Sequence, residues 1–180
     1  ILRNLTKIPS YLVYEAAKAD YVVHAVERLG LEVIESIVEP PGRRSVVGIL
    51  RGDGTGKSLI SSSHLDTHWL NPEMAEIGHQ ALIKDGKIYG VGAGDSMPPL
   101  AATFGAVDAI KRAGIQVGGD VIILCAVDEM SYKEGIKTLQ ENGLKADMAI
   151  IGGATDFEIG IVHTGKVEVE VKTRGYSPFE

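Results

Sequence analysis

The sequence predicts an α/β fold: a three-layer αβα arrangement around a mixed, mostly parallel central sheet. Two observations favour this class. Short apolar runs typical of buried strands recur along the chain, and segments with apolar residues at helical spacing separate them. Strands that alternate with helices in this way form a sheet covered by helices on both faces. A chain of 180 residues, 44% of them hydrophobic, is long enough to bury such a core.

The first half of the chain predicts one helix, three strands and a hairpin. Ser10 is a candidate helix cap because it follows a proline and precedes apolar residues at helical spacing. The strands are apolar or alternating, and the hairpin turns at Asp85 and Gly86. The expected elements are a helix at 11–30, strands at 31–39, 44–52 and 58–63, and a hairpin at 81–90.

The second half alternates helices with strands. Pro98 and Pro99 can open a helix, since proline is tolerated in the first helical turn. The last strand alternates cleanly, with Val167, Val169 and Val171 on one face, so we expect it to be half-exposed and to begin a second, smaller element. The expected elements are helices at 100–114 and 132–143 and strands at 120–127, 147–152, 157–162 and 166–175.

Composition and charge argue against several classes of protein. The net charge of −6 does not suit a nucleic-acid binder, which usually has a basic excess. The single cysteine, Cys125, lies in an apolar run, which indicates a small buried hydrophobe. No stretch reaches the ~18 apolar residues of a membrane helix, and the first residues lack the apolar segment of a signal peptide. We therefore expect a cytoplasmic protein without a membrane partner.

The glycine-rich run "GDGTGKS" at 52–58 resembles a phosphate-binding loop. Arg51 stands where that motif needs its first glycine, and the run leads into a predicted strand, whereas a phosphate-binding loop leads into a helix. A nucleotide site is therefore not expected.

Polar side chains gather where three apolar segments end. His64 and Asp66 follow the third strand, Asp95 follows the hairpin, and Glu129 follows the strand at 120–127. Ligands bind at the C-terminal edge of open α/β sheets, so these residues are candidates for one site. His64 and Asp95 are of the types that bind zinc, Asp66 could fix the tautomer of His64, and Glu129 could act as a general base. Taken singly, His64 also suits a loop histidine and Asp95 a cap or turn residue.

Taken in order, five features resemble the acetylornithine deacetylase / succinyl-diaminopimelate desuccinylase family of zinc metallopeptidases, which includes aminoacylases and carboxypeptidase G. They are "HLDT", the downstream Trp69, "GKIYGVGAGD", "VDEM" and "ADMAIIGGAT…EIGIVHTGKVEVEVKTRG". The resemblance implies a zinc-peptidase-like catalytic domain that hydrolyses amide bonds in N-acyl amino acids or small peptides. It implies that residues 1–165 are the N-terminal part of this domain and that 166–180 begin a lid or dimerisation domain, with a homodimer as a possible assembly.

Carried over by position, the resemblance implies a role for each of the four site residues. His64 is expected to bind the first of two zinc ions and Asp95 to bridge both ions. Asp66 is expected to orient His64, and Glu129 to be the base that takes a proton from water.

The chain departs from the family pattern at the chemical positions. Met130 replaces a glutamate that binds the second ion, and Gly153 replaces a glutamate that binds the first. Ser96-Met97-Pro98 stands in place of Met-Lys-Gly, and Phe179 in place of a histidine that reaches substrate. The expected site is therefore an incomplete two-zinc centre that binds one ion weakly or none. The alternative is an inactive member, or a redesigned fragment, that serves as a scaffold or a binding and dimerisation module.

Overall fold

The fold is described by a computed structural model over residues 1–39, 42–71, 74, 76–162, 164–165, 167 and 169–175. Its helices are α1 (Leu2–Lys7), α2 (Ala16–Arg28), α3 (Met97–Arg112) and α4 (Glu134–Glu141). Its strands are β1 (Glu32–Val38), β2 (Arg43–Leu50), β3 (Leu59–His64), β4 (Leu82–Lys84), β5 (Lys87–Tyr89), β6 (Val121–Ala126) and β7 (Met148–Ile151). In this described part of the chain, no helix has the length and apolarity needed to cross a membrane.

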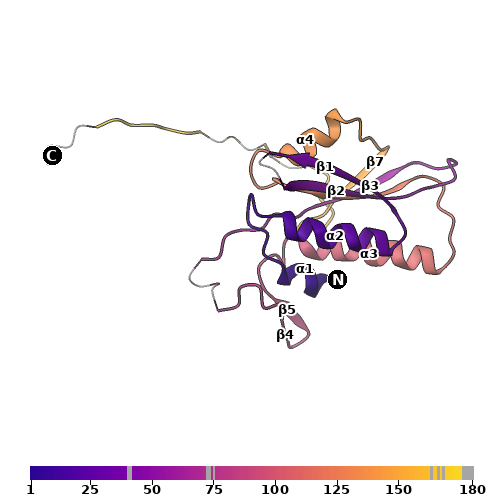
Figure 1. Cartoon of the computed structure of the whole chain (residues 1–180), viewed down its shortest axis with the longest axis horizontal. Coiled ribbons are helices and arrows are strands. Elements are labelled where there is room, and N and C mark those ends of the chain that lie inside the picture. Colours follow the sequence, from indigo (N-terminus) through magenta and orange to yellow (C-terminus); the bar gives the residue numbers. More distant parts are fainter. Residues whose placement is uncertain are drawn as a thin grey trace.

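A mixed five-stranded sheet in the order β1-β2-β6-β3-β7 forms the central layer. The β1/β2 and β2/β6 pairs are antiparallel, whereas β3 lies parallel to both β6 and β7. Helices α2 and α3 cover one face of the sheet, and α4 lies over the other (Figure 1). The predicted α/β class with helices on both faces is confirmed.

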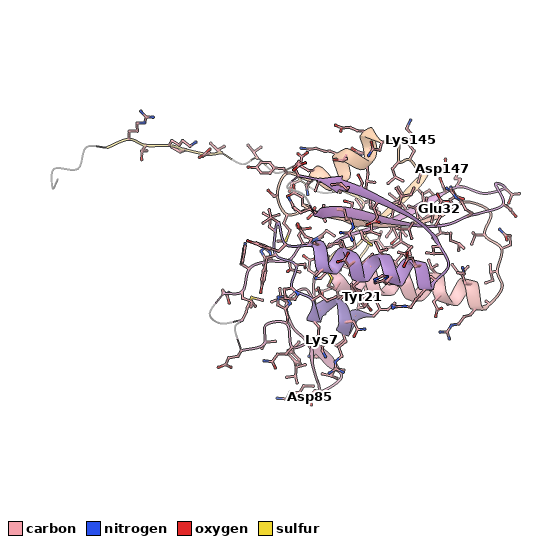
Figure 2. The ribbon with its side chains drawn as sticks, viewed as in Figure 1. Lys7, Tyr21, Glu32, Asp85, Lys145 and Asp147 are labelled. Carbon is pink, nitrogen blue, oxygen red and sulfur yellow. The ribbon has the colours of Figure 1, made fainter. Side chains whose placement is uncertain are left out.

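The pairing of β3 positions the polar side chains of the site. His64 lies opposite Ala126 in the parallel β3/β6 ladder, so the loops that leave both strands begin at the same edge. At the other end, the Asp147 carboxylate accepts hydrogen bonds from the backbone N–H and the hydroxyl of Ser58, both at 2.7 Å. These bonds hold the pKa of Asp147 below its ordinary value and join the chain just before β7 to the start of β3. The Asp147 side chain is labelled in Figure 2.

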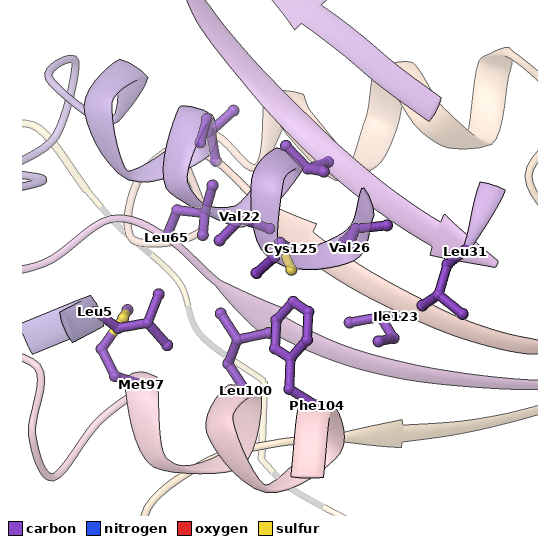
Figure 3. Close-up of a cluster of buried hydrophobic side chains, with 14 of the residues drawn as sticks. Leu5, Val22, Val26, Leu31, Leu65, Met97, Leu100, Phe104, Ile123 and Cys125 are labelled. Atoms are coloured by element: carbon purple, nitrogen blue, oxygen red, sulfur yellow. The ribbon is translucent and has the colours of Figure 1, made fainter. Parts of the chain in front are cut away.

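The main core lies between the sheet and the two helices α2 and α3 (Figure 3). Val22 and Val26 from α2 meet Leu100 and Phe104 from α3, all of them buried. Cys125 of β6 lies in the same cluster and is fully buried, which confirms its interpretation as a small hydrophobe. Burial also raises the pKa of its thiol well above the ordinary value, so the sulfur is unreactive.

The N-terminal prediction needs correction. Helix α2 begins at Ala16, not at residue 11, and its cap is Glu15, not Ser10. The Ser10 carbonyl accepts a hydrogen bond from the N–H of Thr67 at 2.8 Å, and Tyr11 forms a β-bridge with Thr67. This tertiary pairing outweighs the local helical pattern. Helix α1, which the sequence pattern did not reveal, precedes it.

The last two predicted strands are wrong for the described residues. Neither 157–162 nor the described part of 166–175 forms a strand, and the latter runs away from the body of the protein (Figure 1). Val167, Val169 and Val171 are 87%, 77% and 78% exposed. A strand needs a neighbour for its N–H and C=O groups, and the described residues provide none here. Residues 163, 166, 168 and 176–180 lie outside the described residues, and the lid or dimerisation domain implied at 166–180 stays a prediction.

Lys18 of α2 is a lysine buried inside the protein. Its side chain is fully buried, and its Nζ has no hydrogen-bond partner among the described residues. Burial lowers the pKa of Lys18 from 10.5 to about 7, although the negative charge of Asp66 opposes the shift. The ammonium form is thus disfavoured in the folded protein.

Stability is therefore expected to rise with pH above about 7 because of Lys18. The unfolded chain keeps this proton up to its ordinary pKa of 10.5, whereas the folded protein releases it near 7. Between these values the unfolded state binds more protons, so the free energy of unfolding rises by up to ~1.4 kcal/mol per pH unit. Urea unfolding of the wild type and Lys18→Met at pH 7, 8 and 9 measures how much Lys18 contributes to this rise in the free energy of unfolding. Parallel pH dependences of the two proteins would contradict it.

Candidate functional site

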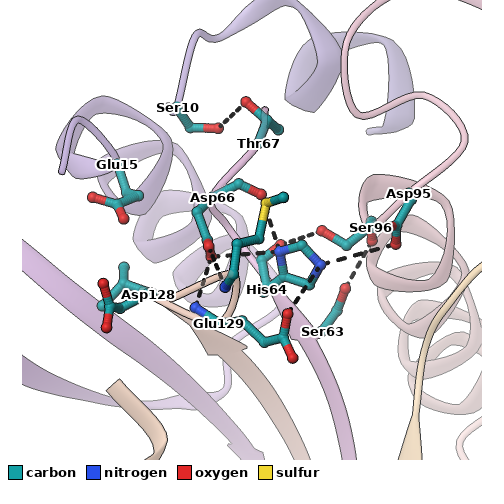
Figure 4. Close-up of polar contacts among 12 residues, drawn as sticks. Ser10, Glu15, Ser63, His64, Asp66, Thr67, Asp95, Ser96, Asp128 and Glu129 are labelled. Carbon is teal, nitrogen blue, oxygen red and sulfur yellow. Dashed lines mark hydrogen bonds and ion pairs between the residues drawn. The ribbon is translucent and has the colours of Figure 1, made fainter. Parts of the chain in front are cut away.

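The four predicted site residues meet at the end of β3. His64 is the last residue of this strand, and Asp66 follows in the loop. Asp95 lies just before α3, joined to Ser96 by a cis peptide bond, and Glu129 lies in the loop after β6. Their side chains point toward one another (Figure 4). The structure thus brings together residues that the sequence separates widely.

The His64 imidazole is the centre of this group. Its Nε2 lies 3.9 Å from Asp95 Oδ1 and 3.9 Å from Glu129 Oε2. Zinc binds nitrogen and oxygen ligands at about 2 Å, so ligand atoms of one ion lie ~3–4 Å apart. The His64 side chain is 11% exposed, whereas those of Asp95 and Glu129 are 57% and 36% exposed. The two carboxylates therefore border solvent, whereas the imidazole is largely buried.

Asp66 holds the imidazole from the buried side. His64 Nδ1 lies 3.0 Å from the carbonyl oxygen of Asp66 and 3.4 Å from its Oδ1. Both oxygens are acceptors, so in the neutral imidazole Nδ1 carries the proton and Nε2 faces Asp95 and Glu129 with its lone pair. The Asp66 carboxylate also accepts hydrogen bonds from the N–H groups of Glu129 and Met130, at 3.2 and 2.8 Å. Asp66 thereby joins His64 to the loop that carries Glu129.

The pKa values of His64 and Asp66 move in opposite directions. Burial alone would lower the pKa of His64, but the hydrogen bond with Asp66 and the surrounding carboxylates raise it above 6.5. Burial alone would raise the pKa of Asp66, but the hydrogen bonds from His64 and from the Met130 N–H lower it below 3.8. Asp66 is therefore an anion whose charge holds the imidazole in place.

A buried ionic network supports the Glu129 loop, and the sequence did not reveal it. Arg43 Nη2 donates to Glu15 Oε1 at 2.8 Å and to Asp128 Oδ1 at 2.9 Å, and all three side chains are buried. Asp128 Oδ2 also accepts from the N–H groups of Tyr132 and Glu134, at 3.1 and 3.3 Å. Asp128 thus fixes the turn between Glu129 and α4.

Aromatic contacts anchor the loop that follows β3. The Trp69 ring stacks on Tyr11 with centroids 4.7 Å apart and planes at 11°. His79 lies 3.0 Å from the Tyr11 hydroxyl through Nε2 and 3.0 Å from the carbonyl oxygen of Thr6 through Nδ1. These contacts join His79 to α1 and to Tyr11.

An open cavity of about 530 Å³ adjoins the site. Its lining residues are His64, His68, Asp95, Glu129, Met130, Ser131 and Lys133. The Lys133 ammonium donates to the carbonyl oxygen of Glu129 at 2.9 Å and forms an ion pair with the Glu129 carboxylate. The cavity thus combines two imidazoles, two carboxylates and a lysine.

The described residues do not fit a two-zinc centre. Among them, no group of three or more His, Cys, Asp and Glu side chains is arranged to hold a metal ion. Met130 contributes a thioether, which suits softer metals, and Gly153 contributes no ligand. His64 and Asp95 offer two ligands to one ion, below the three or so of a catalytic zinc site. Residues 163 and 179 lie outside the described residues.

Comparisons with known proteins define the class. The sequence pattern of the peptidase family M20/M25/M40 matches residues 60–180. The chain belongs to this family. Over 137 residues it is 31% identical to an N-formyl-4-amino-5-aminomethyl-2-methylpyrimidine deformylase of Bacillus subtilis, covering 72% of this chain and 32% of that protein. It is 28% identical over 176 residues to a peptidase M20 domain-containing protein of Schizosaccharomyces pombe, covering 96% of this chain and 42% of that protein.

Two solved structures share the fold. An M20 family metallo-carboxypeptidase from Sulfolobus solfataricus aligns with a TM-score of 0.71 and 24% identity, over 84% of this chain and 36% of that one. Human carnosine dipeptidase 1 aligns with a TM-score of 0.73 and 19% identity, over 83% of this chain and 36% of that one. The chain spans about a third of these structures and 32% to 42% of the two curated relatives above.

Proposed function

We propose that this chain is the N-terminal part of the catalytic domain of a hydrolase that cleaves amide bonds in N-acyl amino acids or small peptides. The observation that carries the proposal is the position of His64 Nε2, 3.9 Å from both Asp95 and Glu129 beside an open cavity. The deformylase relative acts, by its name, on an N-formyl group, which is an N-acyl group. The resemblance to acetylornithine deacetylases and succinyl-diaminopimelate desuccinylases favours the same substrate class.

In this proposal His64 and Asp95 are the metal ligands, Asp66 orients His64, and Glu129 is the base. Glu129 suits proton transfer because its carboxylate borders the cavity where a water and a substrate carbonyl can meet. One zinc ion binds weakly, because this chain supplies two of its ligands. Residues 166–180 would begin a lid or dimerisation domain, and the working protein would be a cytoplasmic homodimer.

A second candidate is a catalytically silent family member that serves as a scaffold or a binding module. Met130 and Gly153 favour it, because each removes an oxygen ligand from the site while the core and the His64–Asp66 pair are kept.

Zinc content and hydrolysis, measured on the purified protein, test the proposal. We expect up to one zinc per chain at high zinc concentration, and hydrolysis of N-formyl or N-acetyl amino acids that Glu129→Gln abolishes. Glu134→Gln is the matched control, because Glu134 is an exposed acid of α4 that pairs with Lys137. Absence of both zinc and hydrolysis would reject the hydrolase and favour the silent module.

A further inference from the structure

Lys133 occupies an unusual position at the edge of the cavity. It is the residue just before α4, with a backbone φ of 60°, and it lies four residues after Glu129. Its ammonium contacts both the carbonyl oxygen and the carboxylate of Glu129. Both side chains line the cavity that also contains His64 and Asp95. Lys133 thus borders the proposed metal ligands.

The charges of the cavity lining explain what this lysine does. Asp95 and Glu129 bring two carboxylates to the same imidazole, 3.9 Å away in each case. Two carboxylates that face the same imidazole repel each other, and a cation beside them lowers this repulsion. Among the described residues that line the cavity, Lys133 is the one lysine or arginine. It therefore supplies a positive charge at a place where the ligand set for a second ion is incomplete.

We propose that Lys133 is a built-in counter-cation of this site, which holds Glu129 in the metal-free protein and competes with a divalent metal ion for the cavity. The inference rests on the proposed function, since it takes His64 and Asp95 as the metal ligands. An ammonium group within a few ångströms repels a divalent ion, and its ion pair with Glu129 must loosen before that carboxylate can turn toward a metal or a water. Lys133 thus lowers metal affinity in addition to the missing ligands at Met130 and Gly153.

Zinc titrations of charge variants test this inference. Lys133→Met removes the charge and is expected to raise zinc affinity about tenfold, the size that Coulomb repulsion at short range allows. Lys133→Arg keeps the charge, and its zinc affinity should equal that of the wild type. Lys137→Met is the matched control, because Lys137 lies on the same helix, pairs with Glu134 and is 54% exposed, like Lys133. Calorimetry with zinc and absorption spectra with cobalt give the affinities, and circular dichroism checks the fold.

The outcomes separate this inference from the proposed function. Tighter zinc binding by Lys133→Met alone supports it. Equal affinity in Lys133→Met and the wild type, with binding lost in His64→Ala, overturns the role of Lys133 and leaves the proposed ligands standing. An equal rise in Lys137→Met also overturns it, since the effect would then be one of net charge. If no protein binds zinc, Lys133→Met included, both the inference and the metal ligands are rejected.

Discussion

Replacement of Arg43 by methionine is expected to destabilise the protein by about 3–5 kcal/mol. Arg43 is buried and donates to the buried carboxylates of Glu15 and Asp128. Methionine keeps much of the volume but leaves two uncompensated charges in the interior. Since Asp128 also fixes the turn that follows Glu129, the variant should loosen the Glu129 loop before it loosens the sheet. Urea unfolding gives the loss in free energy, and hydrogen exchange in the loop gives its location.

The neighbouring arginine is a matched control for this prediction. Arg44 belongs to the same strand but pairs with Asp20 and Glu35, whose side chains are 61% and 42% exposed. Exposed ion pairs of this kind contribute ~0–1 kcal/mol to stability. The free energy of unfolding of Arg44→Met should therefore be close to that of the wild type. Equal losses in the two variants would show that the Glu15–Arg43–Asp128 network does not support the site.

The double variant Met130→Glu with Gly153→Glu is expected to bind zinc well over tenfold more tightly than the wild type, on the order of 100-fold. Each substitution returns a charged oxygen ligand to an ion that otherwise has one or two ligands in this chain. Met130 lines the cavity, and a Cβ at Gly153 would meet no atom within 4 Å, so both side chains have room. Gly152, the preceding residue, lines an adjoining cavity together with His64 and Asp95. Competition with a chelator measures the affinity.

The matched control for this pair is Met130→Gln with Gly153→Gln, which has the same size and no added charge. Amide oxygens are weaker zinc ligands than carboxylates, so the control should gain far less affinity. Unchanged affinity in a correctly folded glutamate variant would refute the assignment of these two positions as lost ligands. Hydrolysis should stay low in both, since Lys133 still engages Glu129.

The sequence was sufficient to predict the sheet and the residues at its edge. Strand β6 is a continuous apolar run and β2 contains one at 46–50, as strands buried on both faces require, whereas β3 has Leu59 and Ile60 before its serines. The edge rule for parallel strands then placed His64 beside Glu129, which the β3/β6 register bears out. Local pattern and tertiary structure agree in this part of the protein.

Other features depend on contacts that local patterns do not carry. Arg43 meets Asp128 across 85 positions, and Ser10 bonds with Thr67 across 57, so no periodicity reveals either pair. Glu129 and Lys133 are four residues apart, which is ordinary helical spacing, so the sequence does not reveal that their ion pair borders a cavity. The segment 166–175 alternates like a strand, but alternation specifies a face and cannot provide the neighbour that a strand requires.

Zinc titration of the wild type beside His64→Ala shows whether half of a metal centre survives at the end of β3. We expect at most one weakly bound zinc per chain in the wild type and no binding in His64→Ala. His24→Ala, which removes an exposed histidine of α2 far from β3 in sequence, should bind like the wild type. Zinc binding that is equal in the wild type and His64→Ala would show that His64 is not a metal ligand.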